Sequence, residues 1–403
     1  MIRFLSISPV IPYDGIGHAG GKTYNFYLKK LNLSDDVDLN VLAFCRKRDA
    51  ELCDLEKYHV RYKLIFSSGN FITNMKHLFF DLLGWAMGHS KMFSLYKLRE
   101  IMAYLKKLKK ADSLPDIIEL EWTNFVLYAK TIHKKYPSIR LIASEHDVSF
   151  LGAQRKQQRA KGFKQLLLKR DCRLLKKEEL EALHYCSIVM PQNEKDKMLL
   201  VEHGIKAECI FVLTPFYHNM EYIVRSDVNY DILFWGAMYR EENYQAALWF
   251  IRQVMPLLAD TNIRFVVAGN RPPQELIDCQ SERIIITGFV EDETSYFEKS
   301  LCFVSPLLTG AGIKVKIIEA LSAGIPVITN DIGIEGIPAK NCSSYFHCDS
   351  PESYEIIIRR LLNGNINLLE LQTKQREVVD QYFNLELSVD RYCDVVLRLG
   401  CSS

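Results

Sequence analysis

The chain has 403 residues, which is long for one domain and enough for two, each with a full core. Apolar residues make up 48% and charged residues 25%, as in ordinary globular proteins and unlike disordered chains. We expect neither a secretory signal nor a membrane-spanning helix, because no stretch approaches about 18 uninterrupted apolar residues. The 11 cysteines follow no metal-ligand spacing, which favours reduced thiols in a cytoplasmic protein without a metal site.

The charge is unevenly divided along the chain. Residues 1–216 hold 35 Lys and Arg against 24 Asp and Glu, a net charge of +11. Residues 217–403 hold 16 against 25, a net charge of −9. Opposite signs predict two domains with different partners, and the acidic half disfavours general binding of nucleic acid.

The first half alternates short apolar runs with helical patterns. Residues 2–11 form an apolar run, residues 15–21 a glycine-rich loop, and residues 23–31 a helical pattern. Further strands are predicted at residues 37–44, 117–120, 140–144, 188–191 and 210–213, with a helix at 123–133. This order predicts a parallel sheet covered on both faces.

Two helical stretches of the first half are rich in Lys and Arg. They span residues 93–110 and 154–177, and the second holds ten basic residues against Asp171 alone. Such stretches are typical either of solvated helix faces or of surfaces that bind anionic lipid or phosphate. Neighbouring aromatic residues favour the second interpretation slightly, although they could equally be core: Phe71, Phe79, Phe80, Trp85 and Phe93.

The second half restarts the pattern after a linker at residues 214–229. Strands are predicted at residues 231–235, 264–268, 284–286, 301–304 and 326–329, and Asn243 is expected to cap a helix that runs to about residue 258. Gly236, Gly269 and Gly288 follow three of these strands. In open parallel sheets ligands bind at such carboxyl ends.

The strongest motif lies at residues 306–329. Gly310 and Gly312 allow close approach of a ligand to the backbone, and a helix is expected to begin near Ile313. The free N–H groups of that helix would favour an anion, which also explains two lysines in its first turn, Lys314 and Lys316. Glu319 follows on the face of Lys316 and could accept hydrogen bonds from a ribose. The motif therefore predicts a nucleoside-diphosphate site.

With this motif the sequence resembles the retaining glycosyltransferases of family 4 (glycosyl transferases group 1). The resemblance covers residues 232–336, including Phe234-Trp-Gly236, Ala268-Gly269 and the stretch 288–292. In the first half it is looser and depends on Gly20-Gly21 and on Glu145-His-Asp147. It implies an α/β GT-B fold: two Rossmann-like domains facing a central cleft, with residues 1–216 binding the acceptor, residues 217–380 binding the donor, and a C-terminal helix (381–403) that crosses back to the first domain.

The resemblance also implies roles for individual residues. Lys316 and Arg240 would stabilise the donor diphosphate, Glu319 would hold the ribose, and His146 would lie near the donor sugar. The remaining nucleotide-binding positions would be Gly310, Ala311, Gly312, Ile313, Lys314, Val290 and Gly236, and the glycine loop at the cleft would hold Gly17, Gly20 and Gly21. Many relatives carry a glutamate where this chain has Ala311, so the sugar is not predicted.

The implied reaction moves a sugar from a nucleoside-diphosphate sugar to a hydroxyl, with retention and without a metal or a further cofactor. The expected acceptor is a glycan or polyprenyl-linked precursor, reached by a cytoplasmic protein that associates peripherally with an anionic membrane surface through its basic half. Two alternatives stay open: a sugar-nucleotide epimerase on the same fold, and a non-catalytic sugar-nucleotide-binding subunit. The glycines of residues 15–20 match GxGxxG, but their position in a long loop disfavours NAD binding.

Overall fold

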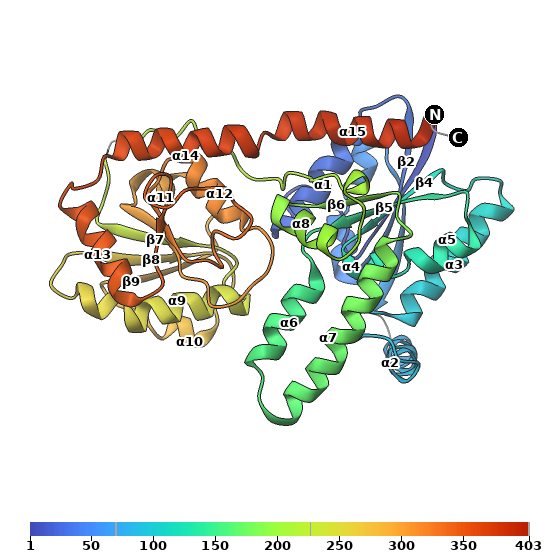
Figure 1. Ribbon diagram of the computed structural model, residues 1–403, viewed down its shortest axis with the longest axis horizontal. Coiled ribbons are helices and arrows are strands. Elements are labelled where there is room, and N and C mark those ends of the chain that lie inside the picture. Colours follow the sequence, from blue (N-terminus) through green and yellow to red (C-terminus); the bar gives the residue numbers. More distant parts are fainter. Residues whose placement is uncertain (69–70, 226, 402–403) are drawn as a thin grey trace. The chain divides into compact units, whose positions relative to one another are not determined.

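The computed structural model describes residues 1–68, 71–225 and 227–401, and it divides into two compact units (Figure 1). Unit 1 comprises Met1–Phe216 together with Leu385–Ser403, and unit 2 comprises Tyr217–Asn384. Each unit is built on one six-stranded parallel sheet with helices on its faces. Among the described helices, none is long and apolar enough to cross a membrane.

The sheet of unit 1 has the strand order β3-β2-β1-β4-β5-β6. Its strands are β1 (Ile2–Ser8), β2 (Val37–Arg46), β3 (Arg61–Ser68), β4 (Ile117–Glu121), β5 (Arg140–Glu145) and β6 (Ile188–Pro191). Every neighbouring pair is parallel, so all six carboxyl ends lie at one edge. The order reverses between β1 and β4, and that is where ligands bind in sheets of this kind.

The helices of unit 1 form two groups. Those packed near the sheet are α1 (Ala19–Leu31), α3 (Leu95–Lys110), α4 (Thr123–Val126), α5 (Ala129–Lys135) and α8 (Glu194–Glu202). The others are α2 (Phe71–Ala86), α6 (Ser149–Arg159) and α7 (Gly162–Leu183), and α6 and α7 form a helical hairpin (Figure 1). The start of α6 and the second half of α7 contribute Phe150, Ala182 and Leu183 to the core. Short 3-10 turns occupy residues 47–52, 55–58 and 207–209.

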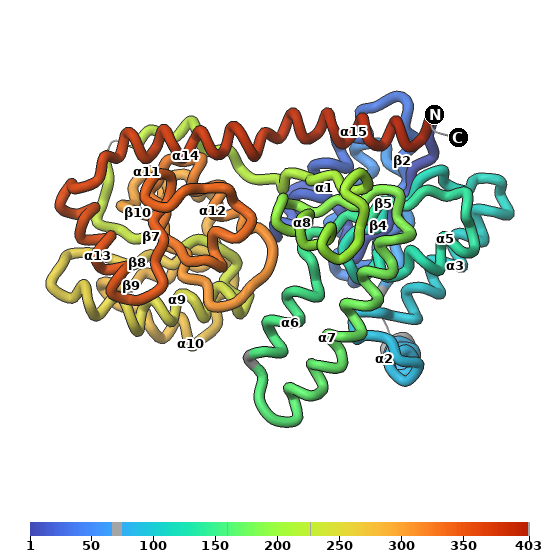
Figure 2. Tube along the Cα trace, in the orientation of Figure 1, coloured from blue at the N-terminus to red at the C-terminus, as the bar shows by residue number. Residues whose placement is uncertain are grey.

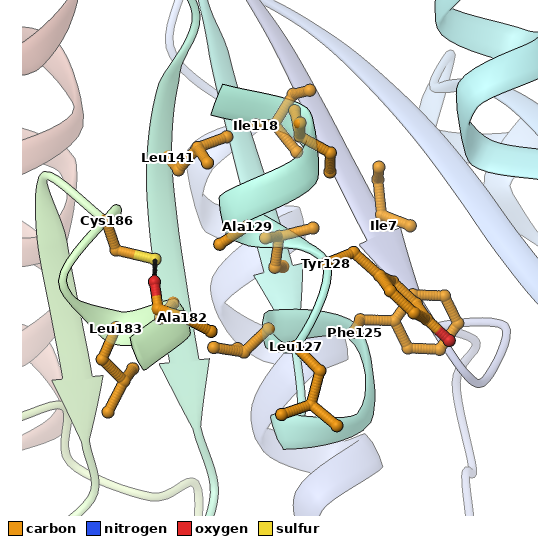
Figure 3. Close-up of a cluster of buried hydrophobic side chains, with 14 of the residues drawn as sticks. Ile7, Ile118, Phe125, Leu127, Tyr128, Ala129, Leu141, Ala182, Leu183 and Cys186 are labelled. Carbon is orange, nitrogen blue, oxygen red and sulfur yellow. Dashed lines mark hydrogen bonds between the residues drawn. The ribbon is translucent and has the colours of Figure 1, made fainter. Parts of the chain in front are cut away.

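A buried apolar cluster joins the sheet of unit 1 to its helices. Ile118 and Leu141 extend from β4 and β5 toward Phe125, Tyr128 and the neighbouring Ala129 (Figure 3). These side chains are almost fully buried, which is the main favourable contribution to folding.

The C-terminal helix α15 (Leu385–Cys401) belongs to unit 1, where it packs beside α1 (Figure 2). Tyr392 and Val396 lie in the second apolar cluster of this unit together with Phe4 and Tyr27. The Tyr27 hydroxyl donates to Ser388 Oγ at 2.7 Å. The last helix therefore completes the core of the unit in which the chain begins.

The sheet of unit 2 has the order β12-β11-β10-β7-β8-β9. Its strands are β7 (Asp231–Trp235), β8 (Arg264–Ala268), β9 (Ile284–Gly288), β10 (Cys302–Ser305), β11 (Val327–Thr329) and β12 (Phe346–His347). Its helices are α9 (Glu241–Gln253), α10 (Gln274–Ile277), α11 (Thr294–Lys299), α12 (Val315–Ser322), α13 (Pro351–Leu362) and α14 (Leu368–Tyr382), with a 3-10 turn at Met255–Leu258. Phe250, Phe265 and Tyr354 lie at the centre of its core.

Several local predictions were wrong. Residues 123–133 form two helices, α4 and α5, and residues 154–177 are divided between α6 and α7. Residues 210–213 contribute one bridge to β6 and no strand, whereas β3 and β12 were missed. Both missed strands lie at an edge of their sheet, although β3 has eight residues and β12 two, and the pairing of an edge strand depends on neighbours that local periodicity does not reveal.

Candidate functional site

The motif at residues 306–329 forms a loop and a helix at the carboxyl edge of the unit 2 sheet. The loop follows β10, and α12 begins at Val315 with Lys314 at its N-cap position, two residues later than predicted. Ile313 and the amides before it therefore belong to the loop. The helix ends before Gly324, whose φ of +68° suits glycine.

Lys316 lies in the first turn of α12 and points toward the end of β7. Its ammonium donates to Asn243 Oδ1 at 2.8 Å, and it lies 4.4 Å from the centre of the Phe234 ring. Asn243 donates in turn to the carbonyl of Ala237 at 2.9 Å, so the loop after β7 holds the lysine in place. Asn243 lies inside α9, with Arg240 at the N-cap, so its predicted capping role was wrong.

The electrostatics of Lys316 favour the arrival of an anion. Burial, together with the positive charges of Lys314 and Arg240, lowers its pKa to about 7, whereas Glu242 and Glu319 act in the opposite direction. A bound anion would raise this pKa again, because it would favour the charged form of the lysine. The arrangement is suited to a diphosphate.

Lys314 holds the glycine loop together. Its ammonium donates to the carbonyls of Ala311, at 3.2 Å, and Gly312. It also lies 3.9 Å from the buried carboxylate of Glu335. A side chain at Gly310, where φ is +138°, would come within 3.3 Å of the Lys314 stem. The loop is thus folded around Lys314, and Lys316 is left to face the end of β7.

Glu319 is nearly buried one turn after Lys316. Its Oε1 accepts the backbone N–H of His218 at 3.4 Å, and the His218 ring lies 2.9 Å from Glu293 Oε1. His218 comes from the linker before β7 and Glu293 from the segment after β9. The linker residue His218 therefore contacts both the carboxylate that the sequence assigns to the ribose and the segment after β9.

Glycines allow close backbone approach at the same edge. A Cβ at Gly236 would lie 3.1 Å from Asn243 Nδ2 and 3.4 Å from Lys316 Nζ. A Cβ at Gly269 would lie 1.6 Å from the Gly236 carbonyl oxygen, so no side chain fits there.

Two other predicted site residues lie in loops of unit 2. Arg240, paired with Glu242, is largely exposed. Val290 lies two residues after β9. Their assigned roles, like those of the other site residues, stay predictions.

His146, the predicted first-half residue, lies at the end of β5 in unit 1. Its Nε2 is 2.9 Å from Glu121 Oε2, its Nδ1 is 2.7 Å from Gln192 Nε2, and its ring stacks on Trp122 at 4.0 Å between centroids. Burial lowers the pKa of His146 to about 4, so the ring is neutral near pH 7. A neutral ring that donates from Nε2 and accepts at Nδ1 satisfies both partners.

Buried carboxyl groups surround His146. Glu119 and Glu121 lie on the same side of β4, and Tyr392 of α15 contacts both oxygens of Glu119 at 3.1 Å. Burial raises the pKa of Glu121 to about 8 and that of Glu119 well above its usual value, and the charge of Glu121 raises the latter further. The two carboxyls therefore retain a proton near neutral pH.

The predicted glycine loop of unit 1 is partly helical. Gly20 and Gly21 lie in the first turn of α1, and only Gly17 remains in a loop. A Cβ at Gly21 would lie 2.7 Å from the ring of His18, whose Nδ1 accepts the Gly21 N–H and caps the helix. A Cβ at Gly20 would lie 3.1 Å from Trp122 and 3.3 Å from His146. The prediction was wrong because the His18 cap starts the helix early.

Among the described residues, one group of side chains has the spacing of metal ligands: Asp331, after β11, His347, at the end of β12, and Asp349, after β12. The two carboxylates are largely exposed, and Asp349 lies 2.8 Å from His347 Nε2. Exposed acidic side chains often gather without an ion, so the group by itself identifies no metal site.

Several contributors to the two sites were not predicted from the sequence. In unit 1 they are Glu121, Trp122 and Gln192. In unit 2, Asn243 was predicted as a cap rather than as the partner of Lys316. The other contributors to unit 2 that were not predicted are His218, Glu293 and Glu335. One signal was present: Glu119 and Glu121 are two acids within an otherwise apolar strand. The others become neighbours only through tertiary contacts.

Sequence comparison finds its matches for part of the chain. Residues 229–364 match the family described as glycosyl transferases group 1, as the resemblance predicted. A curated relative, an uncharacterized 44.6 kDa protein in the cps region of Klebsiella pneumoniae, is 26% identical over 133 residues. This match covers 30% of the chain and 34% of the relative, so the chain matches about a third of that protein's length.

Solved structures resemble the whole chain at low identity. Sucrose-phosphate synthase from Thermosynechococcus elongatus has a TM-score of 0.72 and 15% identity, with 100% of both chains covered. Anabaena Alr3699/HepE in complex with UDP has a TM-score of 0.67 and 12% identity, over 98% of this chain and 100% of that one. At such identities the likeness shows the fold, and the predicted α/β GT-B fold is confirmed.

Proposed function

We propose that this chain, whose residues 229–364 belong to glycosyl transferases group 1, moves a sugar from a nucleoside-diphosphate sugar to an acceptor hydroxyl. The observation that carries the proposal is the cationic group at the start of α12. Lys316 lies beside Gly236 and Asn243 with a lowered pKa, and Lys314 orders the glycine loop that precedes it.

The chemistry needs this positive charge. The bond between the sugar C1 and the diphosphate oxygen breaks, a bond from C1 to the acceptor oxygen forms, and the acceptor hydroxyl passes its proton to the departing diphosphate. Negative charge collects on the leaving diphosphate, where Lys316, Arg240 and the amides at the start of α12 stabilise it. These groups supply charge that a metal ion supplies in other phosphate sites, which supports a metal-independent reaction without a further cofactor.

Retention of configuration is proposed from the resemblance to family 4. The donor nucleotide is proposed from a neighbour: the Anabaena protein of similar fold contains UDP. Glu319, which accepts the backbone N–H of His218, is proposed to hold the ribose hydroxyls, and the backbone around Val290, two residues after β9, is proposed to contact the base. The acceptor is proposed to be a glycan or polyprenyl-linked precursor, and the relative in a cps region supports a role in polysaccharide synthesis.

The test is a thermal-shift screen of nucleoside diphosphates and their sugars, with UDP and UDP-glucose first. We expect a rise in melting temperature with at least one of them, because a ligand that binds only the folded state stabilises it. Glu319→Ala should lose most of that rise, whereas Glu370→Ala, on α14, should keep it. Equal shifts in both variants would remove the donor site from residues 310–319.

Incubation of the protein with the donor, with and without an acceptor, distinguishes a transferase from an epimerase by the product that forms. Release of free nucleoside diphosphate together with a glycosylated acceptor supports the transferase. Conversion of the donor to its epimer in the absence of acceptor supports the epimerase instead. Binding without turnover on any glycan or polyprenyl acceptor would favour the non-catalytic subunit, for which Ala311, in place of a common glutamate, is the motivating observation.

A further inference from the structure

One side of helix α2 packs against α3. Its inner residues contact α3: the His77 ring lies 3.6 Å from that of Tyr96, and the Phe80 ring lies 5.3 Å from the guanidinium of Arg99. A Cβ at Gly84 would lie 3.4 Å from Leu95. Residues 77, 80 and 84 recur at helical spacing, so they define the face that α2 turns toward the protein.

The opposite face of α2 is apolar and exposed. Phe79 is 62% exposed and Leu82 58%, and the other exposed apolar side chains of the helix and its end are Met75, Leu78, Leu83, Trp85 and Met87. An ordinary surface helix places polar residues on this side. The side chains of residues 71–74, including the predicted Phe71, lie outside the described part of the chain. Phe93, also singled out from the sequence, is buried and belongs to the core.

The first half of α7 carries a second exposed apolar face. Phe163 is 75% exposed and Leu166 65%, and Leu167 is also exposed. These residues lie near the end of the hairpin that α6 and α7 form (Figure 1). With Arg170 they follow the spacing of one helix face.

Arg170 joins the two faces. Its guanidinium lies 4.7 Å from the centre of the Trp85 ring and donates to the Trp85 carbonyl at 3.2 Å. The backbone N–H of Lys91, just after α2, donates to Asp171 at 2.7 Å. The apolar residues of α2 and α7 thus meet within one unit, and together we call them the apolar surface: Met75, Leu78, Phe79, Leu82, Leu83, Trp85, Met87, Phe163, Leu166 and Leu167.

The hairpin of α6 and α7, which carries the second part of the apolar surface, is strongly basic, whereas α2 holds one Lys and one Asp. Exposed basic side chains on α6 and α7 and between them include Lys156, Lys161, Lys164, Lys169, Arg173 and Lys177. Residues 154–177 contain ten basic residues and a single acid, Asp171. An apolar face flanked by Lys and Arg is typical of helices that lie in a membrane interface, where acyl chains meet anionic headgroups.

We propose that the apolar surface of α2 and α7 docks unit 1 on an anionic lipid bilayer. The charge selects this occupant: a second copy of the chain would bring two basic hairpins together, whereas anionic headgroups neutralise them. The surface deepens the proposed function, because a polyprenyl-linked acceptor lies in such a bilayer. Its existence does not depend on the donor chemistry.

The experiment measures binding of the full chain to vesicles by sedimentation. Vesicles of phosphatidylcholine with phosphatidylglycerol should bind the protein, and vesicles of phosphatidylcholine alone should bind it at least roughly tenfold more weakly. A Phe79→Ser, Leu82→Ser double variant should lose roughly tenfold or more of the affinity, since two large apolar groups no longer enter the lipid. The matched control, Leu33→Ser with Leu369→Ser, changes two exposed leucines elsewhere and should bind normally.

A second measurement locates the contact. Brominated lipids should quench tryptophan fluorescence through Trp85, which is 44% exposed, and Trp85→Phe should remove most of that quenching while the protein still sediments. Equal binding of the double variant and the control would overturn the proposal. A second outcome would also overturn it: the original protein forms a dimer in solution, the double variant does not, and neither of the two binds vesicles. A nucleotide thermal shift in every variant shows that the donor site is intact, so failure on lipid is distinguishable from failure of the proposed function.

Discussion

The two units share one topology, but basic side chains gather at the site of unit 2 and acidic side chains at the site of unit 1. Counted from the first strand of each unit, both sheets have the order 3-2-1-4-5-6, and both place functional side chains at the carboxyl ends. In unit 2 these ends gather Lys314, Lys316 and Arg240, and in unit 1 they gather Glu121, Glu145 and a neutral histidine. The scaffold determines where a site forms, and the residues that follow each strand determine its charge.

Burial affects the two sites in opposite directions. It lowers the pKa of Lys316 to about 7 and raises the pKa of Glu121 and of Glu145 to about 8. In each unit the charged form is disfavoured, and only a partner can restore it. An anionic ligand would do so in unit 2, whereas in unit 1 the carboxyls satisfy one another and Tyr392 by sharing protons.

Loss of Lys316 should have the largest effect. We expect Lys316→Met to weaken binding of a nucleoside diphosphate by about 2–3 kcal/mol, roughly 30- to 150-fold, because a charge-assisted contact to the diphosphate is removed. Without ligand the variant should be at least as stable as the original protein, since a desolvated cation is gone. Calorimetric titration measures the affinity, and Lys374→Met on α14 is the matched control.

If Lys316→Met bound the nucleoside diphosphate as tightly as the original protein, Lys316 would not be part of the donor site. A variant that is unfolded would leave the affinity unmeasured, so its melting curve is recorded first. Lys316→Arg keeps the charge and should recover part of the affinity.

Protonation of Lys316 should make donor binding depend on pH. Its folded pKa of about 7 rises when an anion binds, so the complex takes up a proton at pH values near and above 7. We expect the affinity to fall as pH rises from about 7 to 9, and titrations in buffers of different ionisation enthalpy to report the proton uptake. Affinity that is constant across this range, with no proton taken up, would show that Lys316 is already charged in the free protein.

Glu121 should make the stability of unit 1 depend on pH. Its folded pKa of about 8 lies above the unfolded value, so the native state holds an extra proton between them. The free energy of unfolding should therefore fall as pH rises from about 5 to 8. Glu121→Gln should flatten this dependence, because it removes the proton that titrates. Denaturant midpoints measured at intervals across that range provide the check, and Glu370→Gln in unit 2 should leave the slope as it was.

The smallest effect is expected at Tyr392. Tyr392→Phe removes the hydroxyl that contacts Glu119 but keeps the ring in the core, so stability should fall by about 1–2 kcal/mol. The loss should be greater at high pH, where Glu119 ionises without its donor. Val395→Ala, in a partly buried position on the same helix, is the control, and its loss should not depend on pH. A loss in Tyr392→Phe that stays constant as the pH is raised until the protein unfolds would separate Tyr392 from the buried carboxyls.

The sequence by itself predicted the GT-B fold and the donor motif. Strands at 231–235 and 264–268 were predicted residue by residue, because each of these central parallel strands is apolar after its first residue and is followed by a glycine. Gly310, Lys316 and Glu319 could likewise be identified, since a glycine, a cation and a carboxylate gathered near the start of a helix indicate a site for a phosphate-bearing ligand.

Only the tertiary structure decided which residues surround these groups. Asn243 lies 73 residues from Lys316 and Tyr392 lies 273 from Glu119, and no local pattern predicts such pairs. The apolar surface was likewise beyond the sequence, which marks Phe79 and Phe93 alike as aromatic although one is exposed and the other buried. Local periodicity records which residues share a face, but only the packing of the whole chain determines whether that face meets another element or is left open.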